Sequence, residues 1–345
     1  MKKVLSIILA PVLSMALLTG CGSSSENKNT NNTSNSETKT TTETKTAEGS
    51  IAKIGLGHIT SIAKSKDLTD GVATGQVDTV MAAVGFDKDN KVVKITIDTA
   101  QTAVKFDQDM KLTSDVNAEY KTKLELGDNY GLKAKSGIGK EWYEQIAALE
   151  DWMKGKTVEE IKAVNTAEDA DLKTSVTVSV DDYVKAVEEA FANAVAVDGA
   201  EKLGLGNDIS IAKSKSAEGE NGAVAQVDTV MMVTAFDKDG KVAGAILDTA
   251  QTKVQFDKDG KVTTDKNGEF KTKVELGDNY GMKKASSIGK EWYEQAAAFT
   301  SWMKGKKVDE IKAVNAAEDA DLKASVTVSV DTYLKTLEEA SNKAK

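Results

Sequence analysis

An internal duplication constrains the fold of this chain more than any other feature. The stretch Gln76-Val77-Asp78-Thr79-Val80-Met81 returns at 226–231, and Leu126-Gly127-Asp128-Asn129-Tyr130-Gly131 returns at 276–281. The stretch Gly139-Lys140-Glu141-Trp142-Tyr143-Glu144-Gln145 returns at 289–295. Each stretch returns 150 residues later. This spacing is the length of a whole domain, whereas solenoid repeats are only about 20 to 50 residues long. We therefore expect two tandem homologous domains, the first copy over 51–197 and the second over 198–345.

The first half of each copy has the pattern of an antiparallel sheet. Residues 77–86 alternate loosely between apolar and polar, and Asp87-Lys88-Asp89-Asn90 predicts a turn from which 92–97 pairs back as a hairpin. A second Asp-rich turn is expected at 106–109. These turns lack the ligand spacing and closing glutamate of a calcium loop, so we interpret them as hairpin turns and expect no metal there.

The second half of each copy has the pattern of helices. Residues 141–154 place Trp142 and Trp152 near one apolar face that we expect to be core, and Gly155 is placed to end that helix. A short helix at 158–164, an alternating strand at 175–180 and a final helix, capped by Asp181 and running to about residue 195, should follow. This order predicts an α+β fold in which each domain is an antiparallel sheet with helices packed on it.

The N-terminus has the composition of an export signal followed by a tether. Two lysines precede an apolar run that is too short to span a bilayer, and Leu18-Thr19-Gly20-Cys21 resembles the lipobox of bacterial lipoproteins. We expect a signal peptide over 1–20, a lipid anchor on Cys21 and a disordered Ser/Thr/Asn-rich tether over 21–50. This places the protein on the outer face of the cytoplasmic membrane. The alternative is an ordinary secretory signal that ends near a cysteine.

The composition excludes several classes of function. Cys21 is the only cysteine and His58 the only histidine, so neither disulfides nor a metal site built on thiols or on several histidines is expected. The formal charge of −9 argues against nucleic-acid binding, which needs basic patches. Because the second copy has Asn207 where the first has His58, we expect His58 to be a surface residue.

A hydroxyl-rich segment before the last helix of each copy is the candidate site. In the first copy it reads Asp171-Leu172-Lys173-Thr174-Ser175-Val176-Thr177-Val178-Ser179, and it returns at 321–329 with Ala324 in place of Thr174. On a strand, Ser175, Thr177 and Ser179 would share one face while the valines face the core. A row of hydroxyls leading into a helix N-terminus suits a phosphate. The alternative is an edge strand with one hydrated face.

This segment resembles the flavinylation motif of the FMN-binding domain family, Asp-x-x-[Ser/Thr]-Gly-Ala-[Ser/Thr]-x-[Ser/Thr]. Upstream, Glu125-Leu126-Gly127-Asp128 and Lys154-Gly155-Lys156 are similar to the Glu-Thr-Pro-Gly-Leu-Gly and Gly-Lys signals of that family. The lipobox and the paired copies are similar to its flavinylated lipoproteins of Gram-positive extracellular electron transfer. One departure is that Ser-Val, at 175–176 and 325–326, replaces the Gly-Ala pair, whose glycine lets backbone approach a phosphate closely.

The resemblance implies two covalent FMN groups, each joined through its phosphate to a threonine, Thr177 or Thr327. A separate flavin transferase, using FAD and a divalent metal, would make these bonds. The motif's leading aspartate falls on Asp171 and Asp321. Its other hydroxyls fall on Ser175, Ser179, Ser325 and Ser329. We interpret Tyr130 and Tyr280, which lie in Gly-flanked loops, as neighbours of the flavin ring.

The implied function is that of an electron carrier, not of an enzyme with its own substrate. It would take electrons from a membrane dehydrogenase or the quinone pool and pass them to acceptors outside the cell. Two alternatives remain open at this stage. One is a surface lipoprotein that binds a ligand or a wall component without redox chemistry, and the other is a structural surface protein whose signal, around 13–20, yields a signalling peptide.

Overall fold

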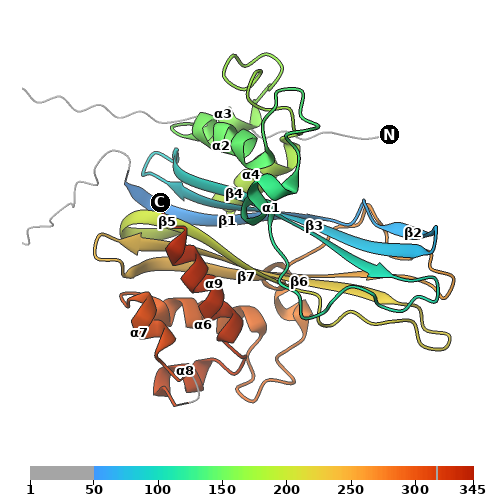
Figure 1. Ribbon diagram of the computed structural model, residues 1–345. Helices are drawn as coiled ribbons and strands as arrows, with labels where there is room; N and C mark the ends of the chain where they lie inside the picture. Colours follow the sequence, from blue (N-terminus) through green and yellow to red (C-terminus); the bar gives the residue numbers. More distant parts are fainter. Residues whose placement is uncertain (1–49, 316–317) are drawn as a thin grey trace, which may run out of the picture. The chain divides into compact units, whose positions relative to one another are not determined.

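Strands from both sequence copies form one antiparallel sheet in the described part of the chain (Figure 1). This computed structural model describes residues 50–315 and 318–345, so the expected signal peptide, Cys21 and the tether up to residue 49 lie outside the described residues. The strands are β1 (Ile51–Ser61), β2 (Lys66–Thr69), β3 (Val72–Phe86), β4 (Val92–Phe106), β5 (Val195–Ser210), β6 (Val224–Asp237) and β7 (Val242–Gln255). Their order is β2-β3-β1-β5-β6-β7, and β4 pairs with β3.

The expected hairpin of each copy is confirmed, with longer strands than the sequence indicated. β3 pairs antiparallel with β4, and β6 pairs in the same way with β7. In the first turn the Asp87 carboxylate accepts hydrogen bonds from the backbone N–H groups of Asp89 and Lys91, both at 2.9 Å. Asp107 makes the same pair of bonds in the second turn. The acidic side chains therefore satisfy the backbone of the turns, as expected of hairpin turns.

The sheet continues across the boundary between the two copies. β1 pairs with β5 at Lys53↔Ala196 and Ile54↔Val195, so the expected boundary at 197 and 198 lies inside a strand that joins the copies. The sheet also curls. Phe106 ends β4 and Phe256 directly follows β7, and their rings meet edge to face with centroids 5.4 Å apart. A central apolar core made by residues of both copies lies inside this curl. The structure thus describes an α+β protein in which the copies share a sheet.

Helices cover the outside of the sheet, one group for each copy (Figure 1). The first group is α1 (Lys123–Leu126), the 3₁₀ turn η1 (Gly127–Tyr130), α2 (Trp142–Met153), α3 (Val158–Lys162) and α4 (Asp181–Ala192). The second is α5 (Lys273–Leu276), η2 (Gly277–Tyr280), α6 (Trp292–Met303), α7 (Val308–Lys312), α8 (Ala320–Ser325) and α9 (Asp331–Asn342). Each group packs on its half of the sheet around an apolar core of its own. Each copy therefore has an apolar core of its own in addition to the core that the two copies share.

The helix α2 confirms the expected amphipathic pattern. Trp142 is buried in the core and donates its indole N–H to the Tyr183 hydroxyl at 2.9 Å, whereas Trp152 is half-buried and donates to the Asp169 carboxylate at 2.7 Å. A capping box on Glu141 begins the helix. It ends before Gly155, whose φ of 78° is the left-handed conformation that favours glycine.

The last helix of each copy lies directly against the sheet, and glycines make this close approach possible. A Cβ on Gly57 of β1 would lie 1.8 Å from the carbonyl oxygen of Ala186 on α4, far inside contact distance. In the second copy a Cβ on Gly206 would lie 1.9 Å from the carbonyl oxygen of Thr336 on α9. Only glycine fits at these positions, so the two copies use the same device.

The expected strand at 175–180 is wrong. The backbone N–H groups of Ser175 and Val176 both bond to the carbonyl of Leu172, as in a helical turn, and the segment pairs with no strand. In the second copy the turn is lengthened into α8. The alternation of valines and hydroxyls is real, because Val176 and Val180 are buried, but they anchor a loop on the helical layer. Asp181 is the first residue of α4, not its cap.

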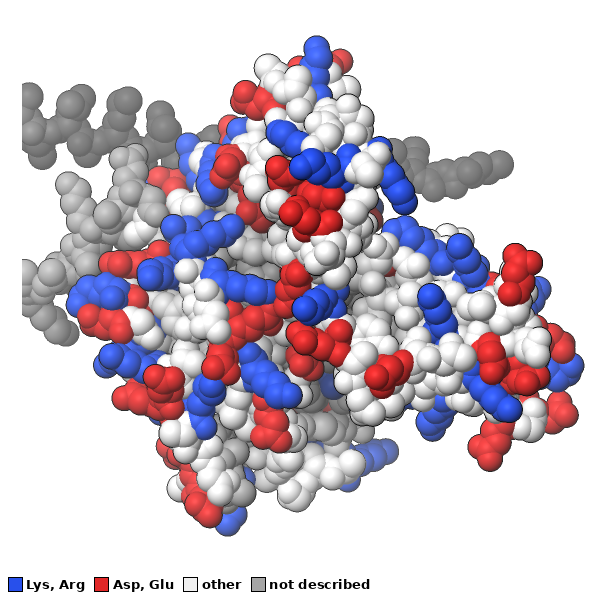
Figure 2. Space-filling model, viewed as in Figure 1, with Lys and Arg blue, Asp and Glu red and all other residues white. Residues whose placement is uncertain are grey.

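No helix among residues 50–315 and 318–345 is long and apolar enough to cross a membrane. On the face shown in Figure 2, lysines and acidic residues are interspersed over both groups of helices and the sheet between them.

Candidate functional site

The two candidate threonines hold the same position in their copies, each on the loop that leads into the last helix. Thr177 precedes α4 and Thr327 precedes α9, and both are exposed to solvent. Between them and the helix, Val180 or Val330 is buried and holds the loop against the helical layer. Each threonine is therefore exposed on a loop that a buried valine anchors to the helical layer.

A buried glutamine holds each threonine. Gln145 of α2 has no exposed surface, and its Oε1 accepts hydrogen bonds from the backbone N–H of Thr177 at 2.8 Å and from the Thr177 hydroxyl at 3.1 Å. Its Nε2 donates to the Ser136 hydroxyl at 3.1 Å and to the Lys140 carbonyl at 3.2 Å. All the hydrogen-bonding groups of this amide are used, so its orientation is fixed.

Gln295 repeats this arrangement in the second copy. Its Oε1 accepts from the Thr327 N–H at 2.7 Å and the Thr327 hydroxyl at 3.1 Å, and its Nε2 donates to Ser286 and to the Lys290 carbonyl. Neither glutamine is among the site residues expected from the sequence. The signal was present, because the stretch that ends in Gln145 returns intact in the second copy, but nothing in the sequence pairs it with a threonine 32 residues further on.

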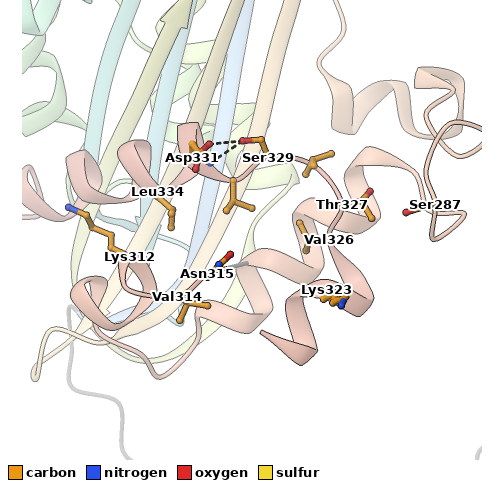
Figure 3. A pocket seen from close by; sticks show the side chains of 12 residues that line it. Ser287, Lys312, Val314, Asn315, Lys323, Val326, Thr327, Ser329, Asp331 and Leu334 are labelled. Atoms are coloured by element: carbon orange, nitrogen blue, oxygen red, sulfur yellow. Dashed lines mark hydrogen bonds between the residues drawn. The ribbon is translucent and has the colours of Figure 1, made fainter. Parts of the chain in front are cut away.

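A cavity of about 820 Å³ opens beside Thr327 (Figure 3). Ser287 lies at one end of it and Lys312 at the other, with the segment around Thr327 between them. Its lining is Ser287, Lys312, Val314, Asn315, Lys323, Leu334 and the run Val326, Thr327, Val328, Ser329, Val330, Asp331. The volume lies within the roughly 300–1,000 Å³ typical of sites for small ligands.

The charge in this cavity is mixed. Lys312 is paired with Glu338 at 2.5 Å, whereas Lys323 makes no ion pair with any residue in the described ranges. Asp331 adds a negative charge to the lining, and it accepts a hydrogen bond from the Ser329 hydroxyl at 3.0 Å. In the first turn of α9 the backbone N–H of Asp331 meets the Ser329 hydroxyl at 3.5 Å, and the N-cap residue Val330 adds no side-chain bond. Lys323 is thus the cation of this cavity that could meet a phosphate.

Some of the expected site residues lie apart from this cavity. Ser325 belongs to α8 and donates its hydroxyl to the Asp321 carbonyl, and neither residue is part of the cavity lining. In the first copy the side chain of Asp169, not Asp171, organises the turn, by accepting backbone bonds from Asp171 and Leu172. Ser175 is half-buried beside this turn.

The tyrosines expected beside the flavin ring have another partner. The ammonium of Lys123 lies 5.0 Å from the ring centroid of Tyr130 and 5.2 Å from that of Trp142. Lys273 repeats this cation–π arrangement at 5.1 Å from both Tyr280 and Trp292. Burial lowers the pKa of Lys123 to about 8. Tyr280 is not among the residues that line the cavity, whose apolar wall is valine and leucine.

His58 is not a surface residue, which corrects the expectation from sequence. It is 6 % exposed, and its Nδ1 lies 2.9 Å from Glu189 of α4 while its Nε2 lies 3.3 Å from Glu275 of α5 in the other copy. Burial alone lowers the pKa of His58, but the hydrogen bonds and charges of both glutamates outweigh it and raise the pKa to about 10. The imidazole is therefore a cation that joins the two copies.

In the second copy Glu339 corresponds to Glu189, and Glu125 of the first copy corresponds to Glu275. These two carboxylates also hold a cation between them. There Lys343 pairs with Glu339 of the same copy and with Glu125 of the first copy, the latter at 3.3 Å. Asn207, the counterpart of His58, donates its side-chain amide to Glu339 at 2.9 Å. Burial raises the pKa of Glu339 to about 7 despite Lys343. The duplication thus kept the geometry and exchanged the residue that carries the charge.

His58, Glu189 and Glu275 offer ligand atoms within 4.8 Å of one another, a spacing that could hold a metal ion. Each ring nitrogen already meets a different carboxylate, and one imidazole cannot turn both nitrogens to one ion. A metal ion bound by all three residues would have to displace one of the two ring–carboxylate contacts. The arrangement fits a bridging imidazolium better than a metal centre.

Comparisons with known proteins add one short similarity. No family model matches the chain, and no solved structure matches it. A protein named chlorophenol reductase, from Desulfitobacterium hafniense, is 51 % identical over 43 residues, which is 12 % of this chain and 13 % of that protein. So short a match carries no activity to this chain.

Proposed function

We propose that this protein is a membrane-anchored electron carrier with a covalent FMN on Thr177 and on Thr327. The observation that carries the proposal is the exposed Thr327 hydroxyl, fixed by Gln295, at the edge of a cavity of about 820 Å³. The equivalent hydroxyl of Thr177 is fixed in the same way by Gln145. We also propose that the two copies are tandem homologous domains that arose by duplication.

The residues around Thr327 fit the groups that FMN would bring. The phosphate would lie near Lys323, whose ammonium makes no ion pair within the described ranges. The ring would lie along the apolar wall that includes Val314 and Leu334. None of the described residues that line the cavity is aromatic, so the stacking on Tyr130 and Tyr280 suggested by the sequence is not part of this proposal.

Attachment would be made by a flavin transferase that uses FAD and a divalent metal. The bond between Thr Oγ and the phosphorus of the FMN half forms as the phosphoanhydride P–O bond of FAD breaks. AMP is the leaving group, and the hydroxyl proton passes to the transferase or to water. Bound FMN supplies redox chemistry that no side chain of this protein has. The protein's part is to hold the ring and leave an edge open for transfer. A membrane dehydrogenase or the quinone pool would be the donor, and acceptors outside the cell would be the targets.

The lipid anchor on Cys21 belongs to the same proposal. It would keep the protein on the outer face of the cytoplasmic membrane, and residues 21–50 would set its reach. A covalent flavin suits that location, because a flavin bound only by contacts would be lost by diffusion once it dissociated.

The test is the colour of the unfolded chain. The mature protein, co-expressed with a flavin transferase, is denatured and desalted, and its visible spectrum is recorded. A flavin spectrum that stays with the chain supports the proposal. A colourless wild-type chain contradicts it and leaves a surface lipoprotein that binds a ligand or a wall component without redox chemistry.

A further inference from the structure

The segment before the last helix of each copy carries several hydroxyls, and their surroundings differ. In the second copy Ser325 donates to the Asp321 carbonyl within α8, Ser329 donates to the Asp331 carboxylate, and Thr327 donates to Gln295. Thr327 is thus the one whose hydroxyl partner is a neutral side chain. The first copy repeats the difference, with Ser179 beside Asp181 and Thr177 bonded to Gln145.

These surroundings matter for any reaction that places a phosphate on the segment. A phosphate on Ser329 would lie against the Asp331 carboxylate, and like charges at that distance repel. A phosphate on Thr327 would have the neutral amide of Gln295 beside it, with Lys323 also lining the cavity. The amide accepts from both the N–H and the hydroxyl of the threonine, which fixes the rotamer and turns the remaining lone pairs of Oγ outward.

We propose that Gln145 and Gln295 are the positioning residues that select Thr177 and Thr327 as phosphate-ester acceptors. The inference rests on the proposed function, since it concerns the site at which flavin is attached. Each glutamine acts through the threonine and does not touch the flavin. Its buried Nε2 bonds to Ser136 and Lys140, or to Ser286 and Lys290, keep the acceptor oxygen Oε1 facing the threonine.

The chemistry of the ester sharpens the proposal. Esterification removes the proton that Oγ donates to Gln145, whereas the bond from the Thr177 backbone N–H to the same amide oxygen remains. The glutamine cannot turn its amide to offer a donor instead, because its Nε2 is already committed. The ester oxygen of a modified threonine would therefore turn away from the amide, in the second copy towards the cavity that Thr327 lines, while the backbone stays in place.

The experiment uses the mature full chain, purified flavin transferase, FAD and Mg²⁺, with flavin at each site followed by peptide mass spectrometry. In Gln145→Met the side chain keeps its length and loses every hydrogen bond. We expect the rate of labelling at Thr177 to fall about tenfold or more, because small misplacements of a reacting group are costly. Thr327 in the same molecule is the internal control and should label at the wild-type rate.

A second variant separates positioning from folding. In Gln145→Glu the carboxyl that is neutral at low pH accepts from the threonine and keeps one of the two donor bonds that Nε2 makes, whereas the ionised carboxylate has no donor to face the Lys140 carbonyl. Relative to Thr327, labelling at Thr177 should match wild type near about pH 6 and fall towards about pH 9, as the carboxyl ionises. A glutamine with a purely structural role would give the same ratio at both pH values.

The outcomes are distinct. Loss at Thr177 in Gln145→Met together with the pH-dependent ratio in Gln145→Glu supports the proposal. Wild-type labelling at Thr177 in Gln145→Met overturns it while the proposed function stands. If Gln145→Met fails to fold, the ratio in Gln145→Glu decides alone, and a constant ratio overturns the proposal. A wild-type chain that takes no flavin at either threonine overturns both.

Discussion

The Nε2 atom of His58 lies 3.3 Å from the carboxylate of Glu275, although the two residues belong to different copies of the duplicated sequence. His58 is on β1 and Glu275 is on α5. Because Nδ1 of the same ring meets Glu189 of α4, one imidazolium holds together the sheet, the last helix of the first copy and the first helix of the second. His58, which the second copy replaces with Asn207, thus joins the two copies.

This joint should make stability depend on pH. The pKa of His58 is about 10 in the folded protein and about 6.5 when unfolded, so its contribution is complete below about pH 6.5 and is lost as pH rises through about 10. We expect His58→Asn to cost about 1–3 kcal/mol at pH 6 and to cost little at pH 10.5. Urea unfolding of both proteins across this range measures the difference, and the comparison cancels the titration of lysines.

Asparagine is the matched substitution, because the second copy already uses Asn207 at this position. Asn207→His in the second copy is the control. It introduces a ring where Lys343 already supplies the charge and should bring no gain in stability. A difference between wild type and His58→Asn that stays constant from pH 6 to 10.5 would show that His58 is not the cation described here.

A buried carboxylate on β4 offers a prediction of the opposite sign. Burial raises the pKa of Asp98 to about 6, although Thr122 and the N–H groups of Leu124 and Thr99 bond to it. The ionised form is therefore disfavoured in the folded protein, and the penalty appears as pH rises from about 4 through about 6. Asp98→Asn should be more stable than wild type at pH 8 by about 3 kcal/mol, the equivalent of a pKa raised by about two units, and equal to it below pH 4.

Thermal melts at these two pH values test the prediction for Asp98. Asp248→Asn is the companion variant, because burial raises the pKa of Asp248 in the second copy as well. An Asp98→Asn protein that is less stable than wild type at pH 8 would mean that the carboxylate charge is needed for the fold.

The close approach of helix and sheet gives a steric prediction. Gly57→Ala places a Cβ 1.8 Å from the Ala186 carbonyl oxygen, so α4 must move away from β1 or the chain must unfold. We expect a loss of about 3 kcal/mol or more. Gly137→Ala is the control, because a Cβ there meets nothing within 4 Å. Equal denaturation midpoints for the two variants would contradict the packing of α4 on Gly57.

The local elements of the fold were largely readable from sequence, and the long-range ones were not. The period of 3.6 residues in α2, its closing Gly155 and the Asp-rich turns are local signals, and the structure has them where they were expected. The pairing of β1 with β5 is not local, because it depends on how two copies meet. A duplication predicts two similar units but does not say whether they share a sheet.

The candidate site shows the same limit. Alternating Val and Ser/Thr residues predicted a strand at 175–180, and the alternation of burial is present, but a strand also needs a neighbour with free backbone groups. The Thr177 N–H bonds instead to Gln145, a residue 32 positions away. His58 was misplaced for a similar reason, because its partner Glu275 lies in the other copy.

The central claim, that Thr177 and Thr327 each carry one FMN, is tested most directly by the intact mass of the denatured mature chain after co-expression with a flavin transferase. We expect two FMN groups on the wild type, one on Thr177→Ala, one on Thr327→Ala and none on the double variant. A wild-type chain without added mass, or a double variant that still carries flavin, would contradict the assignment of these two threonines.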